Sequence, residues 1–393
     1  MIPLAKPSVG AQEAEAAAAT VLSGWLAQGQ QTAAFEREFA AAVGAAHACA
    51  VSNCTVALHL ALLSVGVGPG DEVVTASHSF IASANSVRFC GAEPVFVDID
   101  PNSYNIDPSR LVEAITARTR AILCVHQMGM PCDLHSILRI ARAHNLPVVE
   151  DAACATGSEI LLDGAWQPIG RPHGDVACFS FHPRKVITTG EGGMLTTNSP
   201  ERDRLFRLWR QQGMSVSDLA RHNSAAVIFE SYPVVGYNYR LTDIQASIGR
   251  KQLEKLPSLI ARRRMLARRY TELLAGIPGL GLPIEPPWAR SNWQSYCVRL
   301  PETVGQKDVM QWMLDRGIAT RRGIMCAHRE APYAGATGGP PLRESEHAQD
   351  HCLLLPLHAE MTDADQQTVA DALRDVMSIC EMTSSELEPT TLS

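Results

Sequence analysis

The chain has 393 residues, of which 46% are hydrophobic, so it can bury a large core in two domains or in one large domain with a smaller companion. Charged residues make up 19%, and the formal net charge is −7, without a Lys- or Arg-rich run. These values exclude a basic nucleic-acid-binding surface, whereas small anionic ligands remain possible because local donors bind them.

The cysteines and the apolar runs exclude further classes. Eleven cysteines are scattered along the chain without a CxxC pair or the spacing of a zinc site. Many lie in apolar runs, where a free thiol behaves as a small hydrophobic side chain. The first residues lack a signal-peptide core, and no run approaches ~18 apolar residues. We therefore expect no metal, no membrane and a location in the reducing cytoplasm.

Strand-like and helix-like segments alternate through roughly the first 245 residues. Strands are expected at HACAVS, DEVVTAS, PVFVDID, AILCVH and LPVVED, because these runs are apolar and bounded by Gly, Pro or Asp. Crossover helices are expected between them, at TVALHLALLSVG, FIASANSVRFCG, SRLVEAIT and LHSILRIARAH. This alternation predicts an α/β fold with a mainly parallel sheet covered on both faces.

The pattern changes after about residue 246. Residues 250–277 are typical of one long helix that is interrupted near Pro257 and exposes a basic face to solvent. A shorter α+β region follows, and the last dozen residues have the composition of a loose tail. The sequence therefore predicts a large domain over residues 1–245, a small α+β domain over residues 246–380 and a flexible tail over residues 381–393.

The strongest functional signal is FSFHPRKVITTGEGGM, residues 179–194, in which an apolar strand is followed by Lys185 and a glycine-rich loop. A lysine flanked by hydrophobic and small residues is easily desolvated. Desolvation lowers its pKa and makes the neutral amine available to form an imine. The glycines let the backbone approach a ligand closely. Taken alone, the motif also fits a surface lysine on a turn.

Two further motifs point to the same kind of site. Asp151, in VVEDAACATGS, follows a buried strand, where ligands bind in open α/β sheets. A carboxylate there either keeps the nitrogen of a pyridine cofactor protonated or only caps the next turn. SNCTVALHLALL, residues 52–63, opens a helix whose free N–H groups suit a phosphate, although such caps begin many helices.

These motifs occur in the order found in the DegT/StrS family of enzymes that depend on pyridoxal 5′-phosphate (PLP), and the chain resembles this family over nearly its whole length. The resemblance implies the aspartate-aminotransferase fold (PLP fold-type I), with a mainly parallel sheet of the seven-stranded type and a smaller C-terminal domain. Most members are sugar aminotransferases. The resemblance is carried by SGWLAQG, SNCTVALHLAL, TASHSF, PVFVDID, VVEDAACA, FSFHPRK, GEGGM, GYNYRLTDIQASIG and LLLPLHAEMTDAD.

The resemblance implies a role for each matching residue. Lys185 matches the lysine that forms the internal aldimine and later moves the substrate proton. Asp151 matches the carboxylate paired with the pyridine nitrogen. Phe80 matches the aromatic residue stacked on the ring, a buried core phenylalanine being the alternative. The residues implied at the phosphate are Thr55, Val56, Ser180 and, from the neighbouring subunit of a homodimer with shared active sites, Asn238.

Two positions depart from the family pattern. Cys154, a candidate cofactor contact, stands where the family often has Gln or His, and a thiol is a poor donor to the ring hydroxyl of the cofactor. Cys54 stands in a phosphate loop that usually contains glycine, and it lacks the freedom of glycine at positive φ. Neither change removes the imine chemistry, and both suggest a subgroup of the family.

The function implied by the resemblance is a two-stage, ping-pong transamination. The amino donor is expected to be L-glutamate, and the acceptor a nucleotide-linked 3- or 4-keto sugar, with a keto-cyclitol or another non-sugar ketone as the alternative. Four residues could bind a carboxylate or diphosphate of the substrates, because guanidinium groups suit both, with solvated surface charge as the alternative. They are Arg240, Arg321, Arg322 and His328.

Three other functions are less favoured. A PLP-dependent sugar dehydratase of this family would carry His in place of Lys185. A nonenzymatic regulatory protein of the same fold would be expected to have lost Lys185 or Asp151, and both are present. A nicotinamide dehydrogenase would have GxGxxG in its first strand–helix unit, and this motif is missing there.

Overall fold

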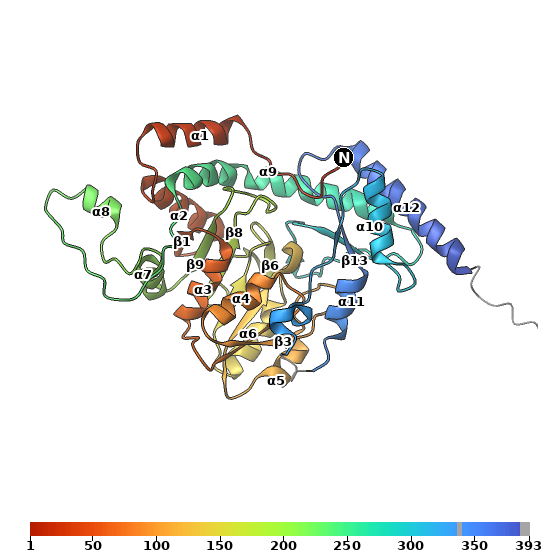
Figure 1. Ribbon diagram of the computed structural model, residues 1–393, viewed down its shortest axis with the longest axis horizontal. Coiled ribbons are helices and arrows are strands. Elements are labelled where there is room, and N and C mark those ends of the chain that lie inside the picture. Colours follow the sequence, from red (N-terminus) through yellow and green to blue (C-terminus); the bar gives the residue numbers. More distant parts are fainter. Residues whose placement is uncertain (336–339, 386–393) are drawn as a thin grey trace, which may run out of the picture.

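The computed structural model describes residues 1–335 and 340–385, and its main layer is a seven-stranded sheet in the order β1-β9-β8-β5-β4-β2-β3 (Figure 1). Neighbouring strands are parallel except where β9 pairs with β1 and with β8. The prediction of a mainly parallel α/β sheet is therefore confirmed. The strands are β1 (His47–Val51), β2 (Glu72–Ala76), β3 (Glu93–Val97), β4 (Thr119–Val125), β5 (Val148–Asp151), β8 (Val176–Ser180) and β9 (Gly193–Thr197).

Helices cover both faces of this sheet. Alternate residues of β1 enter two different hydrophobic clusters, because successive side chains of a strand point to opposite faces. The expected helix at SRLVEAIT is reduced to the 3₁₀ turn η1 (Pro108–Arg110) and four residues of α5. The helices of this part are α1 (Ala11–Leu22), α2 (Gln30–Val43), α3 (Cys54–Ser64), α4 (Ile81–Phe89), α5 (Leu111–Ala114), α6 (Leu134–Ala143), α7 (Pro200–Trp209) and α8 (Asp218–His222).

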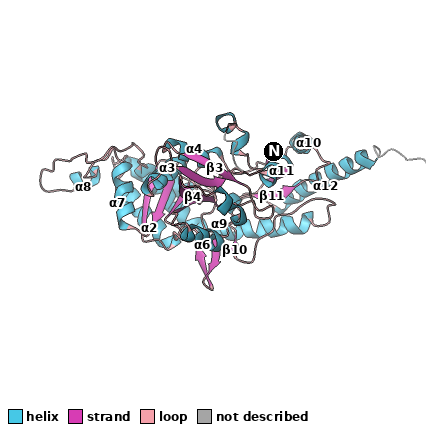
Figure 2. Ribbon diagram, turned by 90° about the horizontal axis from the view of Figure 1, so that it is seen from below, coloured by secondary structure: helices cyan, strands magenta, loops and turns pink. Residues whose placement is uncertain are grey.

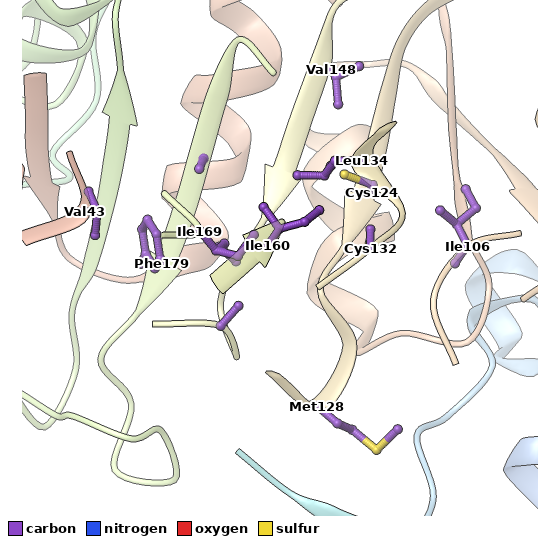
Figure 3. Close-up of a cluster of buried hydrophobic side chains, with 14 of the residues drawn as sticks. Val43, Ile106, Cys124, Met128, Cys132, Leu134, Val148, Ile160, Ile169 and Phe179 are labelled. Atoms are coloured by element: carbon purple, nitrogen blue, oxygen red, sulfur yellow. The ribbon is translucent and has the colours of Figure 1, made fainter. Parts of the chain in front are cut away.

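The larger cluster holds β8 in place. Figure 3 shows Phe179 of β8 among aliphatic side chains that include Val43 of α2 and Ile169. Phe179 also meets the ring of Phe39 edge-on, with the ring centroids 5.0 Å apart. Replacing a buried aromatic residue by alanine typically costs about 3–5 kcal/mol. This packing therefore anchors the strand that leads to Lys185.

The predicted interruption near Pro257 is wrong, because α9 (Asp243–Leu274) runs through it without a break. Proline removes one main-chain hydrogen bond from a helix. However, Leu256 is buried in the core around the main sheet, and Tyr270 is buried in a second core farther along the same helix. Figure 1 shows α9 reaching from the main sheet toward α10 and α12. Tertiary packing at both ends outweighs the local penalty.

The basic face expected on this helix is not simply solvated. Arg263 is 4% exposed, and its guanidinium donates to the carbonyl groups of Trp293, Gln294 and Leu357. Burial lowers the pKa of Arg263 to about 10. The solvated-face prediction is therefore wrong for this residue, which joins α9 to the loops that precede β11 and follow β13.

The second core lies against a three-stranded antiparallel sheet in the order β11-β13-β12. The boundary predicted at residue 245 falls within α9, which packs in both cores. The tail predicted over residues 381–393 begins within α12, and the part beyond Ser385 lies outside the described residues. The elements are β11 (Tyr296–Arg299), α10 (Gln306–Asp315), β12 (Arg321–Arg322), η3 (Ala327–Arg329), η4 (Ala331–Tyr333), α11 (Arg343–His351), β13 (Cys352–Leu355) and α12 (Asp363–Ser385).

A third, small sheet projects from one side of the body near the label β10 (Figure 2). It consists of β6 (Glu159–Leu162), β7 (Ala165–Pro168) and β10 (Ala289–Arg290), while η2 (Gln127–Gly129) follows β4. Among the described residues, no helix combines the length and the apolar character that crossing a membrane requires.

Asp243 joins the start of α9 to the start of α2. One carboxylate oxygen accepts from Gly29 N at 2.7 Å, Thr32 N at 2.9 Å and Thr32 Oγ1 at 2.7 Å, and the other accepts from Gln31 N at 3.0 Å. The first N–H groups of a helix have no partner within the helix. The buried Asp243 therefore caps α2 from more than 200 residues away in the sequence.

Candidate active site

The predicted site residues meet at one edge of the main sheet. Strands β2, β4, β5 and β8 are parallel to one another. Strand β1 runs in the same direction as β8, because β9 lies between them and is antiparallel to both. Their carboxyl ends therefore lie at the same edge, where open α/β sheets bind ligands. The segments that leave these ends are residues 52–56, 77–80, 126–127, 152–154 and 181–185.

Lys185 lies in a turn five residues after β8. Its N–H donates to the carbonyl of His182 at 2.8 Å, and its Nζ donates to Cys154 Sγ at 3.0 Å. Burial opposes the charged ammonium, but Cys154 and Asp151 beside it more than offset this effect and raise the pKa of Lys185. The prediction of a lowered pKa is therefore wrong, because these neighbours were not visible as contacts in the sequence.

Asp151 is the last residue of β5, and its side chain is buried. Oδ2 accepts from Ser83 Oγ at 2.8 Å, and Oδ1 accepts from Ala153 N at 3.1 Å. Burial raises the pKa of Asp151, while the two hydrogen bonds and the charge of Lys185 oppose the shift. The bond to Ala153 is the turn-capping role considered above, and it engages only Oδ1.

A buried polar network lies behind Asp151, and its only signal in the sequence was the acid next to Asp151. Glu150 Oε2 lies 3.1 Å from His126 Nε2, and Oε1 accepts from the N–H groups of His173 and Gly174. Burial would raise the pKa of Glu150, but the hydrogen bonds from His126 and His173 lower it. His126 also donates its N–H to the carbonyl of Asp151, so the network fixes the end of β5.

The predicted phosphate loop is the first turn of α3. Asn53 caps this helix, and its side chain accepts from Val56 N at 3.0 Å. Cys54 lies within the first helical turn with a buried side chain, so this position does not need the positive φ of a glycine. Among the predicted phosphate donors, the Val56 amide is thus already engaged by Asn53.

Gly193 lies between this loop and the end of β8. It pairs with Val51 of β1 on one side and with Ser180 of β8 on the other. A Cβ at Gly193 would come within 2.5 Å of the backbone of Asn53 and within 2.8 Å of Cys54 N. The glycine therefore lets the helix start approach Ser180, which is buried at the strand end.

Phe80 precedes α4 at the end of the segment that follows β2. Its side chain is 57% exposed, which rules out the alternative of a buried core phenylalanine. Its backbone is extended at the N-cap of α4. An exposed aromatic ring at this edge is suited to stacking on a planar ligand.

Known proteins share this arrangement along almost the whole chain. The model of the DegT/DnrJ/EryC1/StrS aminotransferase family matches residues 7–374. GDP-perosamine synthase from Caulobacter vibrioides is 39% identical over 383 residues, which cover 96% of this chain and 98% of the relative. The chain belongs to the DegT/DnrJ/EryC1/StrS aminotransferase family.

Solved structures agree with this assignment. DesI, determined in the presence of its TDP-sugar product, has a TM-score of 0.86 and 30% identity, covering 99% of this chain and 95% of DesI. The PLP form of the putative sugar aminotransferase Spr1654 from Streptococcus pneumoniae has a TM-score of 0.88 and 26% identity. The match covers 96% of this chain and 99% of Spr1654. The predicted family, fold, aminotransferase activity and PLP cofactor are confirmed.

The side chains of this aminotransferase fit PLP in most respects. A lysine for the aldehyde, a carboxylate for the ring nitrogen and an aromatic side chain for the ring face reach the same edge of the sheet. The start of α3 and the Ser180 hydroxyl supply donors of the kind that bind a phosphate. The exception is Cys154, whose thiol contacts Lys185 and is a poor donor for the ring hydroxyl.

Asn238 lies on an extended segment that pairs with the end of β1. Ser52 N donates to Tyr239 O at 2.8 Å, and the rings of Tyr237 and Tyr239 stack on each other and contact His59 of α3. Alternate side chains of an extended segment point to opposite sides. Asn238 accordingly faces away from α3 and is exposed. Within one chain, its side chain is directed outward from the helix that it was predicted to assist.

The predicted substrate residues fall into two groups. Arg240 pairs with Asp218 at 3.5 Å, and Arg322 pairs with Glu330 at 3.7 Å. His328, by contrast, is brought to the site edge. Its Nδ1 lies 2.6 Å from the hydroxyl of Ser77, directly after β2, and its Nε2 lies 3.1 Å from Glu346.

Arg321 is affected by Arg184, which was not among the predicted site residues. Burial and the positive charges of Arg184 and Arg322 lower the pKa of Arg321. Arg184 directly precedes Lys185, so the effect of Arg184 on Arg321 indicates that positive charge lies near the turn that holds Lys185. In the sequence, the signal for Arg184 was its position directly before Lys185 in the motif HPRK.

Proposed function

We propose that this aminotransferase transfers an amino group from L-glutamate to a nucleotide-linked keto sugar, at C3 or C4, in two half-reactions. The observation that carries the proposal is the convergence of two strand ends. Lys185, after β8, contacts Cys154, which follows Asp151 at the end of β5. An amine and a buried carboxylate thus share one small site at the edge of the sheet.

The protein groups have distinct tasks. PLP, when bound, supplies an aldehyde to which amines attach and a ring that withdraws electrons. Lys185 Nζ, when it is free, takes a proton from the substrate carbon and returns it in both half-reactions. Asp151 keeps a negative charge opposite the ring nitrogen, and Phe80 covers one face of the ring. The Thr55 amide and the Ser180 hydroxyl hold the phosphate, while the Val56 amide would need to leave Asn53 to take part.

The names of the relatives support a nucleotide sugar as the acceptor. One relative is a GDP-perosamine synthase, and DesI was determined with a TDP-sugar product. In this chain, Arg184 and Arg321 supply positive charge of the kind that a diphosphate needs, while Arg322 would need to leave Glu330 to take part. We assign Arg321 and His328 to the acceptor, while Arg240 would need to leave Asp218 to take part.

We further propose a homodimer with shared active sites, in which Asn238 reaches the phosphate of the other subunit. Figure 1 shows the segment with α8 projecting away from the body. This segment exposes Val227 to 86%, Phe229 to 91% and Val235 to 88%. Exposed apolar side chains that cluster on one segment mark an interaction surface. The outward direction of Asn238 supports the same assembly.

A cytoplasmic location of the protein remains a prediction.

The experiment that tests the acceptor class is a screen of purified enzyme with PLP and glutamate. Nucleotide-linked 3- and 4-keto sugars and keto-cyclitols are offered in parallel, and the products are identified by mass spectrometry. We expect an amino sugar nucleotide. Amination of a keto-cyclitol alone would contradict the proposed acceptor and favour the alternative. A donor panel with glutamine, aspartate and alanine tests the assignment of glutamate.

A further inference from the structure

A chain of buried hydroxyl groups ends on Asp151. Asp151 Oδ2 accepts from Ser83 Oγ at 2.8 Å, and Ser83 Oγ lies 2.9 Å from Ser79 Oγ. The exposed fractions are 2% for Ser79, 2% for Ser83 and 5% for Asp151. Because these groups are buried, a lost bond among them is not easily replaced by bulk water.

The direction of these hydrogen bonds follows from the charge of the carboxylate. An ionised carboxylate only accepts hydrogen bonds, so Ser83 gives its single hydroxyl proton to Asp151. Ser83 Oγ therefore accepts in its contact with Ser79, and Ser79 is the donor. Each bond in such a chain polarises the next one, which strengthens the contact at the carboxylate.

The same short segment also carries the exposed aromatic ring. Ser79 and Ser83 flank Phe80, the N-cap of α4. On the other side, Asp151 Oδ1 accepts from Ala153 N at 3.1 Å. Two donors on two different oxygens fix the plane of the carboxylate. The start of α4 thus sets both the place of the ring-stacking residue and the orientation of the acid.

We propose that Ser83, supported by Ser79, is a positioning residue that keeps the Asp151 carboxylate ionised and oriented to pair with the pyridine nitrogen of PLP. The inference rests on the role proposed above for Asp151. Without the Ser83 hydroxyl, the buried carboxylate loses a charge-assisted hydrogen bond, and its neutral form becomes more favourable. A neutral acid does not stabilise the protonated pyridine nitrogen by charge.

The test uses holoenzyme loaded with PLP that carries ¹⁵N at the ring nitrogen, and the ¹⁵N chemical shift is followed against pH. In Ser83→Ala, we expect the ring nitrogen to lose its proton at a lower pH than in the wild type. The kcat should fall by about tenfold or more, the scale of one lost hydrogen bond to a charged group, while KM for the amino donor changes much less. Ser83→Thr, which keeps a hydroxyl, should restore the wild-type titration.

Ser86→Ala is the matched control. Ser86 is fully buried on the same helix, and its hydroxyl donates to the carbonyl of Ser83 at 2.7 Å rather than to Asp151. This variant should titrate like the wild type. If Ser86→Ala shifts the titration as far as Ser83→Ala does, the effect reflects the packing of α4 and the inference is overturned.

Asp151→Asn separates this inference from the proposed function. This variant should lose the protonated ring nitrogen and most of the activity, because an amide does not hold the proton by charge. If it does so while Ser83→Ala titrates like the wild type, the positioning role is overturned and the role of Asp151 stands. An unchanged ¹⁵N shift in Asp151→Asn would overturn the proposed role of Asp151 and the inference with it.

Discussion

The sulfur of Cys154 lies 3.0 Å from the side-chain nitrogen of Lys185. The contact joins the turn after β8 to the loop after β5, which is also the loop that starts at Asp151. One of the two positions at which this chain departs from the family pattern is thus in direct contact with the lysine that we propose for the chemistry. The departure therefore belongs to the proposed catalytic site and not to a distant surface.

Lys185 should be the point at which PLP attaches. Purified enzyme should be yellow, and borohydride should bleach the absorption band and fix the cofactor permanently to Lys185. Peptide mapping by mass spectrometry checks the position, and a label on another lysine would contradict the assignment. Lys185→Ala should abolish multiple turnover, because no other described amine is placed at the same strand ends. A circular dichroism spectrum like that of the wild type shows that the variant is folded.

Cys154→Ala should change the pH at which PLP is captured. Cys154 raises the pKa of Lys185, so its removal should lower that pKa and increase the neutral amine at a given pH. The neutral amine is the form that attacks the aldehyde. The midpoint of the capture rate, measured by stopped-flow absorbance with apoenzyme, should therefore move to lower pH. Cys90→Ala, which removes a buried thiol bonded to backbone carbonyls, should leave the midpoint unchanged.

Gly193→Ala should weaken PLP binding and lower the Tm. The added Cβ would collide with the backbone of Asn53 and Cys54, which cannot move without displacing the start of α3. Overpacking of this kind costs about 1–3 kcal/mol. Equilibrium dialysis measures the PLP affinity, and thermal unfolding measures the stability. Gly68→Ala meets no atom within 4 Å and serves as the control. Equal PLP affinity in the two variants would contradict this account of the loop.

Mixing an impaired variant with an inactive one tests whether the active sites are shared. Asn238→Ala should bind PLP less tightly and be impaired, and Lys185→Ala should be inactive. If Asn238 serves the neighbouring subunit, a mixed dimer contains one site with both defects and one site with neither. Activity should then rise above the average of the parents once subunits exchange. Demonstrated exchange with activity at that average would place Asn238 in its own chain's site or outside any site.

Much of the fold could be predicted because its signals are local. The β-branched runs and the acid at the end of VVED follow from periodicity, and Lys185 and Asp151 could be recognised as motifs. The environment of these residues could not be predicted from the sequence. Ser83 reaches Asp151 across 68 positions of the sequence, and Cys154 reaches Lys185 across 31. Such contacts depend on the order of the strands in the sheet, which local patterns do not determine.

The errors have the same origin. Pro257 was expected to interrupt α9, but each half of the helix packs into a different core and holds it together. Arg263 was expected in solvent, but loops far along the chain bring three carbonyl groups to it. The pKa of Lys185 was expected to fall on burial, but its neighbours raise it. In each case a tertiary contact outweighed a correct local tendency.

The cap that Asp243 provides for α2 has a consequence for folding during synthesis of the chain. Synthesis proceeds at about 5–20 residues per second, so Asp243 is made on the order of ten to forty seconds after Gly29, from which it accepts a hydrogen bond. During that interval, α2 is complete in sequence but its first N–H groups lack their native acceptor. The native cap of α2 can therefore form only after more than half of the 393-residue chain has been made, although α2 lies near its beginning.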